Sequence, residues 1–173
     1  MTVTTTDNQE ELFIVVSRRD RIIGYRSRYD CHHDKSLIHR GVNVLVFNKL
    51  GEMLLQKRSL TKDTFPGWWT TAVGGHVAKG ETYRQAAKRE MTEEIGISVA
   101  FRFHSKFIHE YPRETEIESI YIAKSEGPFL PNRVEVERLE FFSKERLAKY
   151  LKTKNFHLTD LALHSLKAIG FIS

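Results

Sequence analysis

The sequence predicts a single domain of the mixed α/β (α+β) class, and three observations support this prediction. Its 173 residues are enough for one domain with its own hydrophobic core. Short runs of alternating apolar residues, typical of strands, are separated by three segments with the spacing of amphipathic helices. Hydrophobic residues make up 40% of the chain and charged residues 28%, as in globular proteins rather than disordered chains. We expect strands and helices in layers, with the main helix between layers of sheet.

The first half of the chain contains most of the predicted strands. Leu12–Val16 and Ile22–Arg26 are short runs rich in apolar residues around a polar turn, which predicts a hairpin. Residues 29–36 are polar and rich in histidine, so we expect a loop or a short turn there. Further strands are predicted at His39–Phe47, at Glu52–Lys57 and, after the loop around Pro66-Gly67, at Thr70–Val73.

The clearest element is a helix from Thr82 to Ile95. Ala86, Ala87 and Met91 supply its inner face, and Gly96 follows it in the usual C-terminal capping position. The elements predicted after it are strands at Ile97–His109, Ile117–Lys124 and Val134–Phe142, then helices at Ser143–Lys152 and Leu158–Ile169. The core side of the last helix is predicted to hold Leu161, Leu163, Leu166 and Ile169.

Composition restricts the location of the protein more than its partner. No apolar run approaches the roughly 18–20 residues that a membrane span needs, and the first residues have no secretory pattern. The single cysteine, Cys31, suits a reducing compartment, so we expect a cytoplasmic protein. The net charge of +5 is compatible with an anionic substrate or with nucleic acid, but the basic residues are spread along the chain. Residues 1–10 are predicted to be flexible, and residues 11–173 to form the domain.

Three glutamates on the main helix indicate metal chemistry. Glu90, Glu93 and Glu94 have the spacing i, i+3, i+4, so their carboxylates project from one face and repel one another. A divalent cation such as Mg²⁺ takes oxygen ligands and removes this repulsion. Taken alone, the three residues fit a solvated acidic face better than a metal site, so the surrounding sequence has to decide.

The segment from Gly75 to Ile97 resembles the Nudix box at each of its nine defined positions. These positions follow the signature G-x5-E-x7-R-E-U-x-E-E-x-G-U, in which U is a bulky aliphatic residue. The resemblance implies a Nudix-type α/β/α sandwich with a mixed sheet, in which residues 75–97 form a loop, a helix and a second loop. It also implies hydrolysis of a diphosphate linkage in a small molecule, such as a nucleoside diphosphate derivative.

The same resemblance assigns roles to individual residues. Mg²⁺ or Mn²⁺ would be held by Glu90, Glu93, Glu94 and the backbone carbonyl of Gly75. Arg89 would orient the carboxylates through charge-assisted pairs, and Glu81 would brace the loop. A carboxylate would serve as general base. We choose Glu90 for this role because it lies in the metal cluster, and Glu135 or Glu137 remain alternatives.

A second resemblance covers roughly residues 28 to 123. The segments His39–Phe47, Gly51–Ser59 and Phe65–Thr70 look like the equivalent stretches of isopentenyl-diphosphate isomerases. This likeness implies that Arg58 and Lys62 bind the substrate diphosphate. It further implies a second site for a transition metal such as Zn²⁺ or Mn²⁺, with the ligands His32, His39, His76, Glu116 and Glu118. Ordinary polar histidines and a solvated strand face are the alternative.

The aromatic loop that contains Trp68 and Trp69 has two interpretations. In a hydrolase it forms a wall against the organic group of the substrate, and we assign Trp69 to substrate binding on this basis. In the alternative interpretation, one of the two tryptophans packs in the core.

One position separates the two resemblances. The isomerases have a catalytic cysteine directly before the Gly-His pair, and Gly74 stands there in this chain. Glycine cannot replace a thiol that transfers protons to and from carbon, so we expect hydrolysis. Isomerase activity and a non-catalytic nucleotide or RNA sensor remain the alternatives. The expected partner is a small-molecule diphosphate rather than nucleic acid, and a homodimer is left open.

Overall fold

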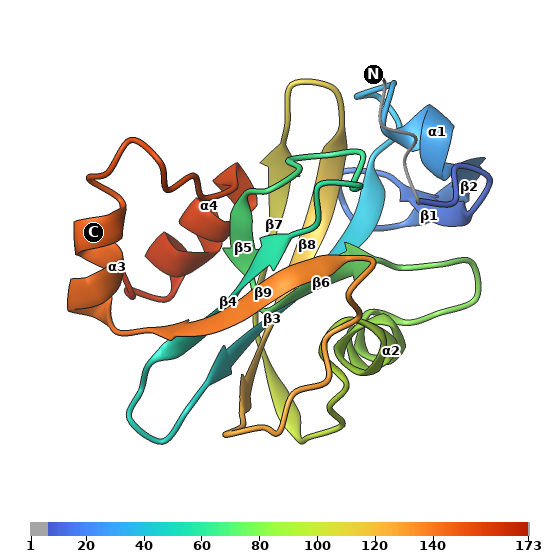
Figure 1. Cartoon of the computed structure of the whole chain (residues 1–173). Coiled ribbons are helices and arrows are strands. Elements are labelled where there is room, and N and C mark those ends of the chain that lie inside the picture. Colours follow the sequence, from blue (N-terminus) through green and yellow to red (C-terminus); the bar gives the residue numbers. More distant parts are fainter. Residues whose placement is uncertain (1–6, 173) are drawn as a thin grey trace.

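The structure, a computed structural model, describes residues 7–172 (Figure 1). Within them, nine strands form one branched sheet that carries helices on both faces. The mixed α/β class and the single domain predicted from the sequence are confirmed. In this part of the chain no helix is long and apolar enough to cross a membrane. Of the terminus predicted to be flexible, residues 1–6 lie outside the described residues.

Strand β3 (His39–Phe47) is the centre of the sheet. It pairs in parallel with β8 (Thr115–Lys124) and antiparallel with β1 (Leu12–Val16), β4 (Met53–Arg58) and β6 (Val73–His76). In this register His39 lies beside Glu116, and Gly41 lies between Glu118 and His76. Residues that are far apart in the sequence are therefore brought together across one strand.

The remaining strands extend the sheet at its edges. The predicted N-terminal hairpin is confirmed, with β1 paired to β2 (Ile22–Ser27), and the histidine-rich segment begins with the one-turn helix α1 (Arg28–Cys31). The other strands are β5 (Trp69–Thr71) and β9 (Val136–Phe142), which pair with β4, and β7 (Phe101–Glu110), which pairs with β8.

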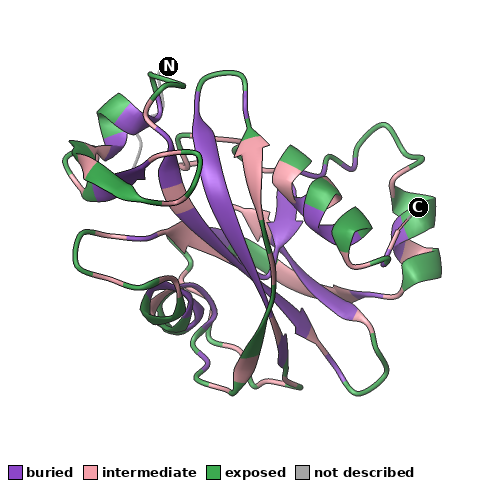
Figure 2. Cartoon of the chain, turned by 180° about the vertical axis from the view of Figure 1, so that it is seen from behind, coloured by how far each residue is buried: buried purple, intermediate pink, exposed green. Residues whose placement is uncertain are grey.

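Two hydrophobic cores lie on opposite faces of the sheet because neighbouring residues of a strand point to opposite sides. Val42, Val44 and Val46 of β3 face the helix α2 (Tyr83–Ile95), whereas Leu45 faces the other core. That second core is covered by α3 (Lys144–Tyr150) and α4 (Asp160–Ala168). Figure 2 shows the buried central strands between the partly exposed helices. The layers match the predicted α/β/α sandwich.

Helix α2 begins one residue later than predicted and ends where predicted. Thr82 is the N-cap and forms a capping box with Gln85, and Gly96 ends the helix with a left-handed φ of 69°. A Cβ at position 96 would overlap the backbone of Leu130, so only glycine fits. The expectation that α2 lies between two layers of sheet is wrong. It packs on one face of the sheet, and its opposite side is exposed to solvent.

Three element boundaries differ from the prediction for identifiable reasons. The single strand expected at Thr70–Val73 is divided into β5 and β6, because the chain changes its partner from β4 to β3 at Ala72. The last helix begins after Leu158, since Thr159 caps it and Leu158 pairs with Trp69. Strand β7 begins four residues later than predicted because the amide of Ile97 still bonds to Met91 at the end of α2.

Candidate active site

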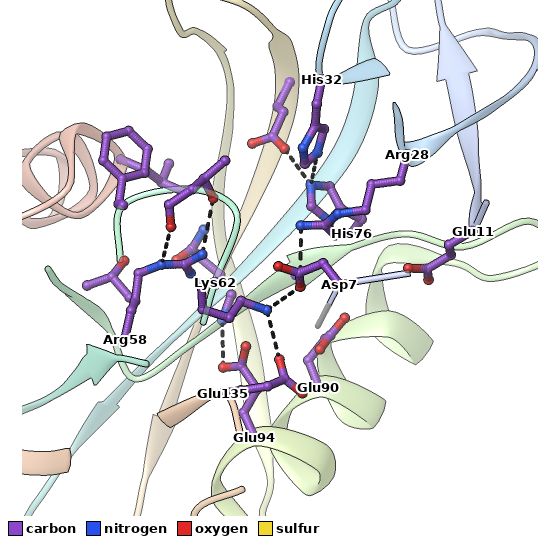
Figure 3. Close-up of a pocket in the computed structure, with 18 of the residues that line it drawn as sticks. Asp7, Glu11, Arg28, His32, Arg58, Lys62, His76, Glu90, Glu94 and Glu135 are labelled. Atoms are coloured by element: carbon purple, nitrogen blue, oxygen red, sulfur yellow. Dashed lines mark hydrogen bonds and ion pairs between the residues drawn. The ribbon is translucent and has the colours of Figure 1, made fainter. Parts of the chain in front are cut away.

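A cavity of about 660 Å³ opens between α2, the N-terminal hairpin and the loop that follows β4. Figure 3 shows charged side chains pointing into it from elements that are far apart in the sequence. It brings together most of the residues predicted to act in the site, which are Arg58, Lys62, Gly75, His32, His76, Arg89, Glu90, Glu93, Glu94, Glu116 and Glu118. His39 and Trp69 are the two predicted residues that do not line it.

Helix α2 presents Glu90 and Glu94 to the cavity. Glu94 Oε2 accepts hydrogen bonds from Gln56 Nε2 at 2.7 Å and from the Gly74 backbone N–H at 3.2 Å. Glu90 lies against Gly75, where a Cβ would overlap its carboxylate. Burial raises the pKa of Glu90 to about 7 and that of Glu94 to about 8, and repulsion between the two carboxylates adds to the shift of Glu94.

Arg89 connects the helix to the loop before it. Its guanidinium forms a two-pronged pair with Glu81 at 2.8 and 2.9 Å, and it donates to the His76 carbonyl at 3.0 Å. The same group contacts Glu90 at 2.8 Å and Glu93 at 3.0 Å. Glu81 also accepts the Ala78 backbone N–H at 3.1 Å. These contacts are the kind that the bracing and orienting roles of Arg89 and Glu81 require.

Glu93 differs from the other two glutamates of the helix. Its side chain is 51% exposed, and Arg89 is its ion-pair partner. It lines the rim of the cavity, whereas Glu94 is buried. A cation bound at this end of the cavity therefore meets two buried carboxylates and one exposed carboxylate.

Four of the five residues predicted for a second metal site converge. Ligand atoms of His32, His39, His76 and Glu116 all lie within 4.8 Å of one another. Glu116 Oε1 is 3.0 Å from His39 Nε2 and 2.9 Å from His76 Nε2. Burial lowers the pKa of His32 to about 2 and that of His76 to about 4. Neutral imidazoles retain the lone pair that a metal requires, so this set, which we call the histidine cluster, fits a transition metal.

Glu118 follows Glu116 by two residues and lies on the same side of β8. It occupies the space beside Gly41, where a Cβ would approach its carboxylate to 2.6 Å, and it accepts a hydrogen bond from Asn43 Nδ2 at 3.1 Å. Burial and the neighbouring Glu116 raise its pKa well above the usual range. Glu114, which no sequence pattern indicated, also contacts the cluster, since its Oε2 is 3.2 Å from His32 Nε2.

The cationic side of the cavity contains Arg58, Lys62 and Arg28. Arg58 donates to the carbonyl and hydroxyl oxygens of Thr64 at 3.0 and 3.1 Å. Lys62 pairs with Glu135 at 3.2 Å and with Asp7 at 2.5 Å. Arg28 was missed from the sequence because it reaches the cavity from α1, and the preceding Ser27 and the polar loop gave no local signal.

Trp69 requires a correction. Its side chain is buried in the core beneath α4, stacked on Phe156 with ring centroids 5.5 Å apart, and it does not line the cavity. Strand β5 turns this residue inward because its main chain bonds to residues 157 and 159. The aromatic and apolar side chains that do line the cavity are Phe65, Ala78, Tyr111, Val134 and Leu161. Leu161, expected in the core, therefore faces the cavity.

The residues at both ends of the cavity suit cations of different kinds. Next to α2 the potential ligands are oxygen atoms, and Gly75 leaves room for them because it has no side chain. In the histidine cluster they are imidazole nitrogens and a carboxylate. Among the described residues, ligand atoms lie within 4.8 Å of one another in the histidine cluster, and the Mg²⁺ site next to α2 stays a prediction.

Comparison with known proteins agrees with this geometry. A family model described as the NUDIX domain matches residues 37–162. A Pseudomonas aeruginosa protein described as an uncharacterized Nudix hydrolase is 35% identical over 136 residues, which are 78% of this chain and 80% of that protein. The chloroplastic isopentenyl-diphosphate Delta-isomerase II of Arabidopsis thaliana is 30% identical over 168 residues, and the match covers 83% of this chain but 59% of the isomerase.

A solved structure extends the similarity to nearly the whole chain. The crystal structure of a Deinococcus radiodurans protein superposes with a TM-score of 0.78 and 26% identity, and it covers 91% of this chain and 99% of that one. The matched segment, the glutamates of α2 and the sandwich of layers all agree. The chain belongs to the Nudix family.

Proposed function

We propose that the protein hydrolyses a diphosphate linkage in a small molecule, with a divalent cation, Mg²⁺ or Mn²⁺, held by Glu90, Glu93, Glu94 and the Gly75 carbonyl. The observation that carries this proposal is the convergence of Glu90 and Glu94 on the cavity beside Gly75, opposite Lys62. Two buried carboxylates destabilise one another unless a proton or a cation compensates them. The cavity also contains cationic groups for phosphate oxygens, so both parts of a cation–diphosphate complex have partners.

The cation, when bound, supplies Lewis-acid polarisation of the diphosphate oxygens. The chain supplies position and proton transfer. Lys62 and Arg58 hold phosphate oxygens by charge-assisted hydrogen bonds. Arg89 keeps Glu90 and Glu93 in place through the contacts at 2.8 and 3.0 Å.

Glu90 is our choice for the general base that accepts the proton of the attacking water. Its pKa, raised to about 7 by burial, lies near the pH at which such a base is most effective. Glu135 is the alternative, because it lines the cavity and contacts Lys62. Glu137 is a poorer choice, since it points to solvent with its side chain 43% exposed and pairs with Lys57.

A substrate panel tests the proposal. Nucleoside diphosphates, nucleoside diphosphate sugars and short alkyl diphosphates are incubated with Mg²⁺ or Mn²⁺, and phosphate or nucleotide release is measured. We expect turnover of at least one class, no turnover with a chelator, and loss of activity in Glu90→Gln. An absence of cation-dependent turnover across the panel contradicts the proposal.

The histidine cluster favours one second candidate, an isomerase acting on an allylic diphosphate. It predicts conversion of isopentenyl diphosphate without phosphate release. Two features weigh against it. Position 74 is glycine, and the thiol of Cys31 is buried between Phe13 and Val15 with its pKa raised to about 12, mainly by burial. We further propose that the cluster holds a transition metal beside the hydrolytic site.

A further inference from the structure

Asp7 reaches into the cavity beside two of its cationic residues (Figure 3). Its Oδ1 lies 2.5 Å from Lys62 Nζ and 3.6 Å from Arg28 Nη2, and its Oδ2 accepts the Asp63 backbone N–H at 3.1 Å. Only 7% of the Asp7 side chain is exposed. An ammonium, a guanidinium and a main-chain N–H around one oxyanion are the environment that proteins offer to a phosphate group.

The two cations are fully compensated while Asp7 is in place. Lys62 also contacts Glu135 at 3.2 Å, and Arg28 forms a two-pronged pair with Asp63, with both distances 3.1 Å. Each cation therefore has two carboxylate partners. Burial raises the pKa of Asp7, but its pairs with Lys62 and Arg28 lower this pKa by more. The carboxylate is therefore charged. A diphosphate entering the cavity has to replace this carboxylate to reach both cations.

The segment that carries Asp7, which we call the N-terminal strap (residues 7–11), is bonded through its main chain to the start of α1. The Gln9 carbonyl accepts the Tyr29 amide at 3.1 Å, and the Glu11 carbonyl accepts the Arg28 amide at 2.8 Å. Strand β1 begins at the next residue. Asp7 lies outside the described strands, so its carboxylate can leave Lys62 and Arg28 without breaking strand pairing among the described residues.

We propose that Asp7 is an internal substitute for a substrate phosphate group, and that ligand binding exchanges its carboxylate for a phosphate at Lys62 and Arg28. The inference rests on the proposed function of the cavity as a diphosphate site. The strap then regulates that site, because a ligand binds only to the fraction of molecules in which Asp7 is out. A strap that occupies the site about 90% of the time weakens the apparent affinity about tenfold.

Binding of methylenediphosphonate, a diphosphate analogue that cannot be hydrolysed, tests the exchange without turnover. Isothermal titration in the presence of Mg²⁺ compares the wild-type protein with Asp7→Asn. We expect Asp7→Asn to bind about tenfold more tightly. Glu10→Gln is the matched control, since this substitution removes the same charge from the same strap at an exposed position. This control is expected to bind as the wild-type protein does.

Hydrogen–deuterium exchange of the wild-type protein gives a second readout that needs no variant. Methylenediphosphonate is expected to accelerate exchange in residues 7–11. Equal or weaker binding by Asp7→Asn, or exchange that is unchanged or slower with the ligand, overturns the inference. Tighter binding by Asp7→Asn without turnover of any diphosphate would contradict the proposed hydrolysis and keep the exchange. Turnover of a diphosphate together with unchanged binding by Asp7→Asn would support the proposed hydrolysis and contradict the exchange.

Discussion

The two ends of the cavity use the same strand but different ligand chemistry. On β6, Gly75 faces Glu90 of α2, whereas the next residue, His76, points to the other side and belongs to the histidine cluster. Neighbouring residues of a strand point to opposite sides, so one strand separates an oxygen-rich site from a nitrogen-rich site. The Nudix helix supplies the first site, and the contacts of β3 with β8 supply the second.

Under the proposed function, this difference divides the work between the two sites. Oxygen ligands on a buried helix face favour a hard cation, which suits phosphoryl chemistry. Imidazoles favour a transition metal and hold it more tightly than oxygen ligands do. Substitutions at one end that leave the other intact test this division, and the pH dependence of stability, to which both ends contribute, has the smallest expected effect.

Removal of either buried carboxylate is expected to have the largest effect. Glu90→Gln or Glu94→Gln should lower kcat for diphosphate hydrolysis by about 10²–10⁴-fold, because each removes a cation ligand and Glu90 is also the proposed base. Steady-state kinetics in Mg²⁺ measures this. Glu137→Gln is the control, since Glu137 lies outside the cavity. Full activity in both active-site variants would remove the helix from the mechanism.

Gly75→Ala tests the close approach between β6 and α2. The added methyl group would overlap the Glu90 carboxylate, so this side chain must move. A displacement of about 1 Å lowers catalysis by roughly 10²-fold. Gly24→Ala is the control, because the only atom near its new methyl group is an arginine nitrogen 3.9 Å away. Wild-type rates in Gly75→Ala would show that the position of Glu90 is not critical.

His39→Gln perturbs the other end. It removes one imidazole from the histidine cluster, so zinc or manganese affinity is expected to fall at least about tenfold. Metal content after dialysis, measured by mass spectrometry, reports this loss. His104→Gln, at an exposed position, is the control. Magnesium-dependent hydrolysis should fall less than in Glu90→Gln, and an equal fall would mean that the two sites act as one.

The pH dependence of stability is the smallest expected effect. Glu90, Glu94 and Glu114 have pKa values raised to about 7, about 8 and about 8, first of all by burial. A carboxyl group with a raised pKa stabilises the folded state at low pH, and this contribution is lost as the pH rises through the folded-state value. The melting temperature of the metal-free protein should therefore fall by about a few degrees between pH 6.5 and 8.5. His32 and His76 oppose part of this fall, because burial lowers their pKa to about 2 and about 4 while a histidine of the unfolded chain still loses its proton near pH 6.5.

Mg²⁺ separates this effect from general alkaline destabilisation. It should raise the melting temperature more at pH 8.5 than at pH 6.5, because cation and proton compete for the same carboxylates. Glu94→Gln should flatten the profile. A melting temperature of the metal-free protein that does not change with pH would contradict the assignment of buried, proton-sharing carboxylates to the cavity.

Local patterns made α2 and its glutamates predictable from the sequence. The helix has a capping residue at each end and three carboxylates at helical spacing, and all of this information lies within 23 residues. The apolar strands β1 and β3 were predicted with the observed bounds. Val134 and Glu135 were placed in a strand, but they bond to Asn132 in a turn, which directs Glu135 into the cavity.

The rest of the site depends on contacts between distant segments. Asp7, Arg28 and Glu114 carry no motif, and they reach the cavity because the hairpin, α1 and the β7–β8 turn fold over it. The orientation of Trp69 depends on pairing between β5 and the segment before α4, ninety residues further along. Glu118 lies on the same side of β8 as Glu116. It is paired with Gly41, however, whereas Glu116 is paired with His39 of the histidine cluster.

Isotope labelling tests the central claim most directly. The active substrate from the panel is turned over in ¹⁸O-labelled water with Mg²⁺, and the products are followed by phosphorus-31 NMR. We expect one product phosphate to carry a single ¹⁸O atom in the wild-type protein, and no such product with Glu90→Gln. Consumption of the diphosphate without ¹⁸O in any phosphate product would contradict hydrolysis at phosphorus.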